Sequence, residues 1–199
     1  MISHVAIILF SREFKAVALK QDELQLVKGC LNNKRKAQRQ LYEHYKVAMF
    51  RLCQRYAKDR QEAEDILQEG FIKVFKDLKN YRGDGALGGW IRRVIVNVAL
   101  QHIRKQKHRL TTVDVNYLPE QAEEDTYDYE ETVSRAKELT KFLQQLPTGY
   151  RTVFNLYVLE SYTHKEIAEA LSISVSTSKT QLFKAKAMLR KMLKKSMIS

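Results

Sequence analysis

Two carboxylates one helical turn apart come nearest, in this chain, to a catalytic or metal-binding pair. Asp65 and Glu69 are four residues apart, and carboxylate oxygens at that spacing could in principle hold Mg²⁺. Glu62 and Glu64 extend the same acidic surface, which a solvated or protein-docking role explains better than a metal site. The sequence lacks a Walker loop, a zinc deaminase motif and a Ser-His-Asp constellation. We therefore expect no catalytic residue, no metal ion and no cofactor.

A second group of side chains has the types that suit nucleic acid. Arginines hold phosphates, and aromatic faces stack on exposed bases. The stretch Asn80–Gly89 holds four glycines and predicts a flexible hinge, and a helix is expected to begin near Trp90. The polar and aromatic residues of the hinge and of the outer side of this helix are Arg82, Trp90, Arg92, Arg93, Asn97 and Arg104.

Amphipathic helices position both groups. The acidic helix has apolar residues at i, i+3/i+4 spacing: Ile66, Leu67, Phe71, Val74, Phe75 and Leu78. Its start is acidic and its end is basic, which suits the helix dipole. The helix after the hinge turns inward Ile91, Val94, Ile95, Val98 and Leu100. His102 and His108 do not share a face of it, so we expect both to be exposed.

Two further helices precede the acidic one. Asp22–Gly29 predicts a short helix, and a long helix is expected from Ala37 to about Tyr56. Cys30 and Cys53 lack the neighbours of a zinc site, which predicts two small buried side chains in a reducing cytoplasm. The apolar run Val5–Phe10 is too short to span a bilayer and lacks the flanks of a signal peptide, so no membrane insertion is expected.

The C-terminal part of the chain predicts a helix-turn-helix. Helices are expected at Val133–Leu146 and Tyr150–Leu159, and Thr163 and Glu166 have the spacing of a capping box. The turn Ser172–Ser174 leads into a long basic helix from Val175 to about Lys194. The residues on its early, exposed side, where base edges and phosphates are reached, are Ser176, Thr177, Lys179, Thr180, Gln181 and Lys184.

Charge divides the chain into two basic blocks and an acidic bridge. Its formal net charge is +12. Residues 1–108 carry 22 basic and 11 acidic groups, residues 109–134 carry one and eight, and residues 135–199 carry 12 and four. Basic blocks favour polyanions through counterion release. The bridge is aperiodic and poor in apolar residues, which predicts a flexible linker.

The string Asp65–Phe71, followed by Tyr81-Arg82-Gly83, Trp90, Asn97 and Arg104, resembles domain 2 of bacterial RNA polymerase sigma factors of the extracytoplasmic-function type. The stretches Leu146-Pro147, Tyr162–Ala168 and Thr177–Leu189 resemble domain 4 of the same sigma-70 family. Two positions depart from domain 4: Ser172 replaces a common glycine, and Ser178 replaces an inward-packing apolar residue. Both changes are expected to loosen the helix pair.

The resemblance implies an all-α fold of two small helical domains. The expected limits are an extension at 1–21, domain 2 at 22–109, an acidic linker at 110–132 and domain 4 at 133–199. It also implies that the acidic helix binds core RNA polymerase through Asp65, Gln68, Glu69, Phe71 and Lys73. The hinge and the next helix would then melt and read the promoter −10 element, and the helix-turn-helix would read the −35 element. An anti-sigma factor is a common further partner in the family.

The favoured hypothesis is a non-catalytic, cytoplasmic promoter-specificity subunit that binds core polymerase and promoter DNA and no small-molecule substrate. A stand-alone helix-turn-helix regulator is the alternative. It would need a dimer face or ligand pocket in residues 1–130, where the sequence indicates neither. The two differ in whether promoter binding requires core polymerase. An enzyme acting on nucleic acid is the third and least favoured hypothesis.

Overall fold

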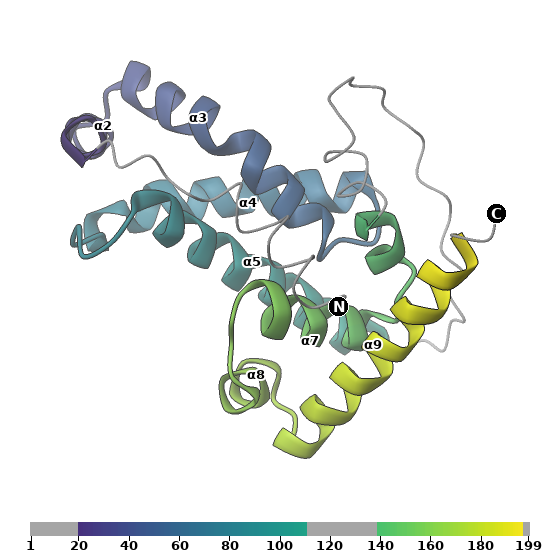
Figure 1. Cartoon of the computed structure of the whole chain (residues 1–199). Helices are drawn as coiled ribbons and strands as arrows, with labels where there is room; N and C mark the ends of the chain where they lie inside the picture. Colours follow the sequence, from purple (N-terminus) through teal and green to yellow (C-terminus); the bar gives the residue numbers. More distant parts are fainter. Residues whose placement is uncertain (1–19, 111–138, 197–199) are drawn as a thin grey trace. The chain divides into compact units, whose positions relative to one another are not determined.

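The computed structural model describes residues 20–110 and 139–196, which form two compact helical units (Figure 1). No strand occurs within these ranges, and the predicted all-α fold of two helical domains is confirmed for them. The predicted domain limits stay predictions. The extension before Lys20 and the acidic linker after Leu110 lie outside the described residues.

The described part of the first unit consists of four helices and one short turn. They are α2 (Lys20–Leu31), α3 (Arg35–Gln54), α4 (Arg60–Asp77), the 3-10 turn η2 (Leu78–Asn80) and α5 (Leu87–Leu110). All four predicted helices are therefore present. The boundaries of the first two differ from the prediction by about two residues at each end. The last helix begins at Leu87 and not near Trp90, so Gly88 and Gly89 belong to its first turn and not to the hinge. The fully buried side chains of this unit include Leu41, Met49, Leu52, Tyr56, Ile66, Val74, Leu78, Leu87, Ile91 and Ile95.

Glycines set the close approach of neighbouring helices in this unit. A Cβ atom on Gly70 would lie 2.9 Å from Cγ1 of Ile95, where α4 crosses α5. A Cβ atom on Gly29 would lie 2.7 Å from Cβ of Ala37, where α2 meets α3. Both distances are shorter than a packed side chain tolerates, so the two glycines allow backbones to pack directly.

The second unit begins with a helical segment at residues 139–144, the part of the predicted helix Val133–Leu146 that is described. It continues with α7 (Thr148–Phe154), a π-helical turn (Asn155–Leu159), α8 (His164–Leu171) and α9 (Val175–Ser196). Within the described residues the predicted helices are present, although the sequence did not indicate the π-helical turn. Its buried apolar side chains include Leu143, Val153, Phe154, Leu156, Ile167, Leu182, Ala185 and Leu189.

The two cysteines of the chain, Cys30 and Cys53, are free and buried, as predicted. Burial raises the pKa of the Cys53 thiol to about 12. Among the described residues, no helix combines the length and apolar character needed to cross a membrane. Nor do three or more His, Cys, Asp or Glu side chains gather there in a way that would hold a metal ion.

Candidate protein and nucleic-acid interfaces

The outer side of α4 carries polar side chains around one exposed apolar residue. Asp65, Gln68, Glu69 and Lys73 are all exposed. Ile72 is 69% exposed and stands three residues after Glu69 and four after Gln68, so these side chains are neighbours on the helix surface. We call Asp65, Gln68, Glu69, Ile72 and Lys73 the α4 face. Ile72 was not among the predicted residues of this face, although an isoleucine outside the buried stripe of an amphipathic helix was the available signal.

Phe71 lies beneath this face and not on it. Its side chain is 3% exposed, and its ring meets the ring of Tyr42 edge-on, with centroids 4.8 Å apart. It therefore supports α4 against α3 and offers no surface to a partner. Of the five residues that the resemblance implied for polymerase binding, the four polar ones are the ones that a partner can touch directly.

Glu62 does not share the exposed environment of its acidic neighbours. Its side chain is 7% exposed, and its carboxylate accepts hydrogen bonds from the backbone N of Lys58, at 2.6 Å, and from the amide of Gln106. Nε2 of His102 lies 3.5 Å from the same carboxylate. The predicted solvent exposure of Glu62 and His102 is therefore wrong, because both side chains take part in the packing contact between α4 and α5. The side chain of His108 lies outside the described residues.

The hinge before α5 is organised around an aromatic pair. The rings of Tyr81 and Trp90 have centroids 5.6 Å apart, and the hydroxyl of Tyr81 donates to the carbonyl of Gly85. Gly83 has a φ of 78°, in the left-handed region that favours glycine. Burial raises the pKa of Tyr81, and the nearby carboxylates of Glu23 and Asp84 add to this effect. The phenol therefore stays protonated and able to donate.

Four of the predicted residues lie along one side of α5. Trp90, Arg93, Asn97 and Arg104 fall within about 60° around the helix axis, because an α-helix turns once in about 3.6 residues. Trp90 is half-buried, and the other three are exposed. We call these four the α5 stripe. Arg92 is half-buried and lies about 100° around the axis from Arg93, so it does not belong to the stripe. Arg82 is exposed in the hinge.

Local hydrogen bonds fix the helix-turn-helix of the second unit. The hydroxyl of Thr163 accepts from the backbone N of Glu166 at 3.2 Å, and Oε2 of Glu166 accepts from the backbone N of Thr163 at 2.7 Å. The predicted capping box is thus confirmed. Ser174 caps α9 as predicted, because its Oγ accepts from the backbone N of Thr177 at 3.0 Å. Ser172 ends α8 in the left-handed region, with φ 52°.

A buried polar contact joins α8 to α9. Ser178 is fully buried, and its Oγ lies 2.9 Å from Nδ1 of His164. The imidazole stacks on Tyr157, with ring centroids 4.5 Å apart. Burial lowers the pKa of His164, and the positive charges of Lys179 and Lys186 lower it further. Ser178 thus has a hydrogen-bonding partner where the sequence predicted a looser helix pair, and nothing in the sequence pattern had indicated this partner.

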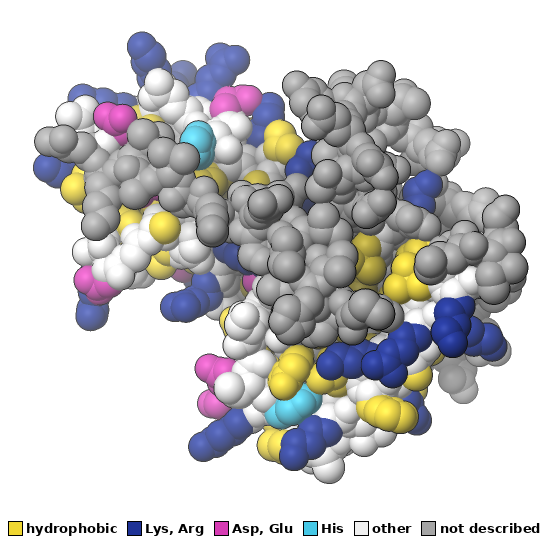
Figure 2. All heavy atoms as spheres, viewed as in Figure 1, with side chains coloured by type: hydrophobic (Ala, Val, Ile, Leu, Met, Phe, Trp, Pro, Cys, Tyr) yellow, Lys and Arg dark blue, Asp and Glu magenta, His cyan; other side chains and the backbone are white. Residues whose placement is uncertain are grey.

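The outer surface of α9 carries the predicted reading residues and one exposed aromatic ring. Ser176, Lys179, Thr180 and Lys184 are exposed, whereas Thr177 and Gln181 are half-buried. Phe183 is 73% exposed and stands at helical spacing from Lys179 and Thr180. No acidic residue occurs in α9, and Figure 2 shows Lys and Arg side chains along it. Phe183 was missed, although its place outside the buried stripe of a basic helix could have indicated it.

Comparison with protein families identifies this arrangement. Residues 41–109 match the family described as Sigma-70 region 2, and residues 136–189 match Sigma-70, region 4. The chain belongs to the sigma-70 family of RNA polymerase sigma factors. The first match covers the α4 face and the α5 stripe, and the second covers the helix-turn-helix.

Curated relatives place this sigma factor among those of extracytoplasmic-function type. It is 30% identical over 182 residues to the RNA polymerase sigma-H factor of Pseudomonas aeruginosa, covering 87% of this chain and 94% of the relative. It is 31% identical to the ECF RNA polymerase sigma factor SigW of Bacillus subtilis, covering 75% and 85%. A solved structure of the sigma factor RpoE with the anti-sigma factor NepR from Bartonella quintana matches with 16% identity and a TM-score of 0.48, covering 90% of this chain and 98% of that one.

Proposed function

We propose that this sigma factor divides its work among three surfaces: the α4 face binds core polymerase, the hinge and α5 stripe hold the melted −10 strand, and α9 reads the −35 element. The alternative, a regulator that acts without polymerase, leaves the α4 face without a role. The observation that carries the proposal is Ile72, exposed among Asp65, Gln68 and Glu69. An apolar anchor ringed by polar groups is typical of a protein-binding surface.

At the α5 stripe, capture of unstacked bases would supply the energy for strand opening. Trp90 offers a partly exposed ring, and Arg93 and Arg104 lie on the same side of the helix as phosphate partners. Stacking on an aromatic side chain contributes roughly 1–3 kcal/mol for each base. Opening promoter DNA in this way requires no catalytic group, so the chain acts as a non-catalytic subunit.

On α9, reading of the duplex would combine charge with apolar contact. Lys179 and Lys184 reach phosphates or guanine edges, and the exposed ring of Phe183 suits the methyl group of thymine. The half-buried Gln181 is held near α7, where a Cβ on Gly149 would lie 3.3 Å from its Nε2. Its role is therefore to position α9 as well as to contact bases. Partners of this kind act in the cytoplasm, where we expect this protein to act, and an anti-sigma factor is a proposed further partner.

The proposal is tested by run-off transcription with purified core polymerase over a genomic library. Promoter-specific transcripts should appear with this chain and be absent without it. The chain alone should bind DNA weakly, with strong salt dependence and little sequence preference. Specific promoter binding by the chain without core polymerase would instead favour the stand-alone regulator.

The α4 face is tested by Glu69→Lys and Ile72→Ala, measured as affinity for core polymerase. Each should weaken binding by about tenfold or more, which corresponds to about 1.4 kcal/mol, while binding of the chain alone to DNA stays unchanged. Glu64→Lys is the matched control, because Glu64 is exposed on α4 and already pairs with Arg60 at 2.9 Å. Loss of helical signal in Glu69→Lys would show that the residue is structural.

A further inference from the structure

Five cations gather where α2 meets α3, outside every surface assigned above. All five are exposed, and none lies within ion-pair distance of a carboxylate among the described residues. We call them the α2–α3 corner: Lys28, Lys34, Arg35, Lys36 and Arg39. Several other cations of this unit do have a carboxylate nearby, such as Lys46 beside Glu43 and Lys73 beside Asp77.

The lysines of the corner converge on one open groove between the two helices. Lys28 from α2, Lys34 from the turn and Lys36 from α3 all line it. Two carboxylates also line this groove, Asp22 and Glu43, but Oε2 of Glu43 lies 2.6 Å from Nζ of Lys46 and is neutralised there. The groove therefore offers a net positive charge together with amide groups, which is the chemistry that holds phosphate oxygens.

Three of these cations, Lys34, Arg35 and Lys36, stand at the start of α3, where they cost stability, whereas Lys28 lies in the last turn of α2. The first turn of α3 contains no acidic residue, and Lys34 at its N-cap position makes no side-chain cap. Cations near a helix N-terminus are opposed by the helix dipole, and an uncapped first turn leaves backbone N–H groups without partners. Departures from favourable local sequence of this kind are typical of functional sites.

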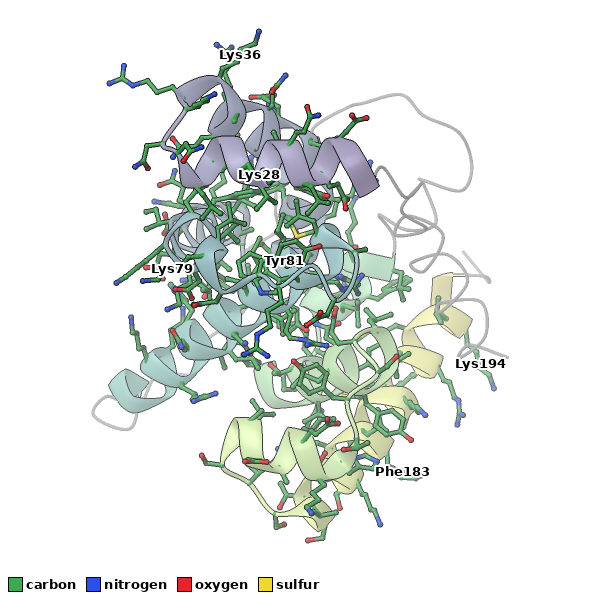
Figure 3. The ribbon with its side chains drawn as sticks, turned by 90° about the vertical axis from the view of Figure 1, so that its left-hand side faces the viewer. Lys28, Lys36, Lys79, Tyr81, Phe183 and Lys194 are labelled. Atoms are coloured by element: carbon green, nitrogen blue, oxygen red, sulfur yellow. The ribbon has the colours of Figure 1, made fainter. Side chains whose placement is uncertain are left out.

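Contacts through Tyr45 connect the helix that carries Lys28 with the proposed nucleic-acid surface of the same unit. The hydroxyl of Tyr45, in α3, donates to Glu23 of α2 at 3.2 Å, and a Cβ on Gly88 of α5 would lie 3.0 Å from the Tyr45 ring. Contacts through Tyr45 thus tie α2 to the start of α5. Figure 3 shows Lys28 between Tyr81 of the hinge and Lys36 at the corner.

We propose that the α2–α3 corner binds the phosphate backbone of promoter DNA that continues beyond the segment held by the hinge and the α5 stripe. The part of this inference that concerns the path of the DNA, from the hinge toward the corner, rests on the proposed nucleic-acid role of the hinge. The binding itself depends only on the unpaired cations. The bound DNA is either duplex or single-stranded, and the two forms present the same phosphate chemistry.

The test compares Lys34→Gln/Lys36→Gln with the wild-type full chain in salt titrations of DNA binding. The probes are a labelled duplex of about 30 base pairs of arbitrary sequence and an oligothymidine of about 30 nucleotides. The slope of log K against log salt is negative, and for two lost phosphate contacts its magnitude should fall by about 1.8 on duplex or about 1.4 on the single strand. A fall on one probe alone identifies the form of DNA that is bound.

The matched control is Lys58→Gln/Arg60→Gln, which removes the same charge from cations that stand beside Asp59 and Glu64, outside the groove. Its slope should stay within about 0.5 of the wild-type value. An equal fall in both variants, or no fall in Lys34→Gln/Lys36→Gln on either probe, would overturn the proposal. The melting temperature of the corner variant should be equal to or above that of the wild type, because the substitutions remove an unfavourable interaction between these cations and the dipole of α3.

Trp90→Ala, titrated on the same oligothymidine, separates this inference from the proposed function. A variant that binds the single strand as tightly as the wild type would count against the −10 role of the α5 stripe. The corner would still be judged by its own slope, since that measurement does not involve Trp90.

Discussion

At the scale of single residues, the contact between His164 and Ser178 shows how a DNA-reading helix can be fixed by a polar bond in place of an apolar one. The serine hydroxyl is fully buried and would be costly to leave without a partner. The imidazole that supplies the partner lies in the first turn of α8, near Lys179 and Lys186. A charged imidazole is therefore disfavoured there by burial, by two ammonium groups and by the helix dipole.

This geometry predicts a loss of stability of the second unit at mildly acidic pH. The pKa of His164 is lowered in the folded state, so below about pH 6.5 the unfolded chain binds more protons than the folded chain. The contribution of the neutral imidazole is complete above that pH and declines as the pH falls toward the lowered pKa. Thermal melting from pH 8 to 5 should show this decline in the wild type and less of it in His164→Asn, whose amide can replace Nδ1. Parallel pH profiles for the two proteins would contradict the prediction.

Gly70 is a second residue whose effect can be measured directly. Gly70→Ala adds a methyl group 2.9 Å from a buried Ile95 side chain, and overpacking costs about 1–3 kcal/mol. The gain in helix propensity is at most about 1 kcal/mol, so a net loss of about 1–2 kcal/mol in unfolding free energy is expected. Gly89→Ala is the matched control in α5, because nothing lies within 4 Å of the added atom. Urea denaturation should show the first variant destabilised and the second unchanged or stabilised.

At the scale of elements, the acidic residues of α4 have two different roles, one in packing and one at the solvent-exposed face. The carboxylate of Glu62 is buried against α5, whereas Asp65 and Glu69 face solvent. Glu62→Ala should therefore lower the unfolding free energy by about 1–3 kcal/mol, since the backbone N of Lys58 and the amide of Gln106 lose their acceptor. Chemical denaturation followed by circular dichroism measures this. Equal stability of Glu62→Ala and Glu64→Ala would contradict a structural role for Glu62.

The elements themselves could be predicted from the sequence because their signals are local. Apolar spacing indicated the helices, and the capping box of Thr163 and Glu166 lies within four consecutive residues. The misses depend on contacts between residues far apart in the chain. Glu62 is buried through Gln106, 44 residues later, and Ser178 is satisfied by His164, 14 residues earlier. Ile72 and Phe183 were missed for another reason, because apolar spacing identifies the buried stripe of a helix but does not show whether an apolar residue outside that stripe is exposed.

At the scale of the whole molecule, the described residues contain two separate hydrophobic cores. Separate cores allow separate unfolding, so a core substitution should act on its own unit alone. Ile91→Ala and Leu189→Ala each remove a fully buried side chain and should cost about 2–5 kcal/mol. Hydrogen exchange followed by mass spectrometry should show faster exchange in α2 to α5 for the first variant and in α7 to α9 for the second. Faster exchange throughout the chain in either variant would show that the units unfold as one.

Because both native cysteines are buried, cysteines introduced at the surface of this protein can be labelled selectively. A maleimide reacts with a thiolate, and a buried thiol with a pKa of about 12, like that of Cys53, is almost entirely protonated at neutral pH. Cys30 is buried as well, and burial also raises its pKa. A dye pair attached to cysteines introduced at exposed positions of α3 and α9 would therefore report energy transfer between the two units, before and after core polymerase is added, with both native cysteines left in place.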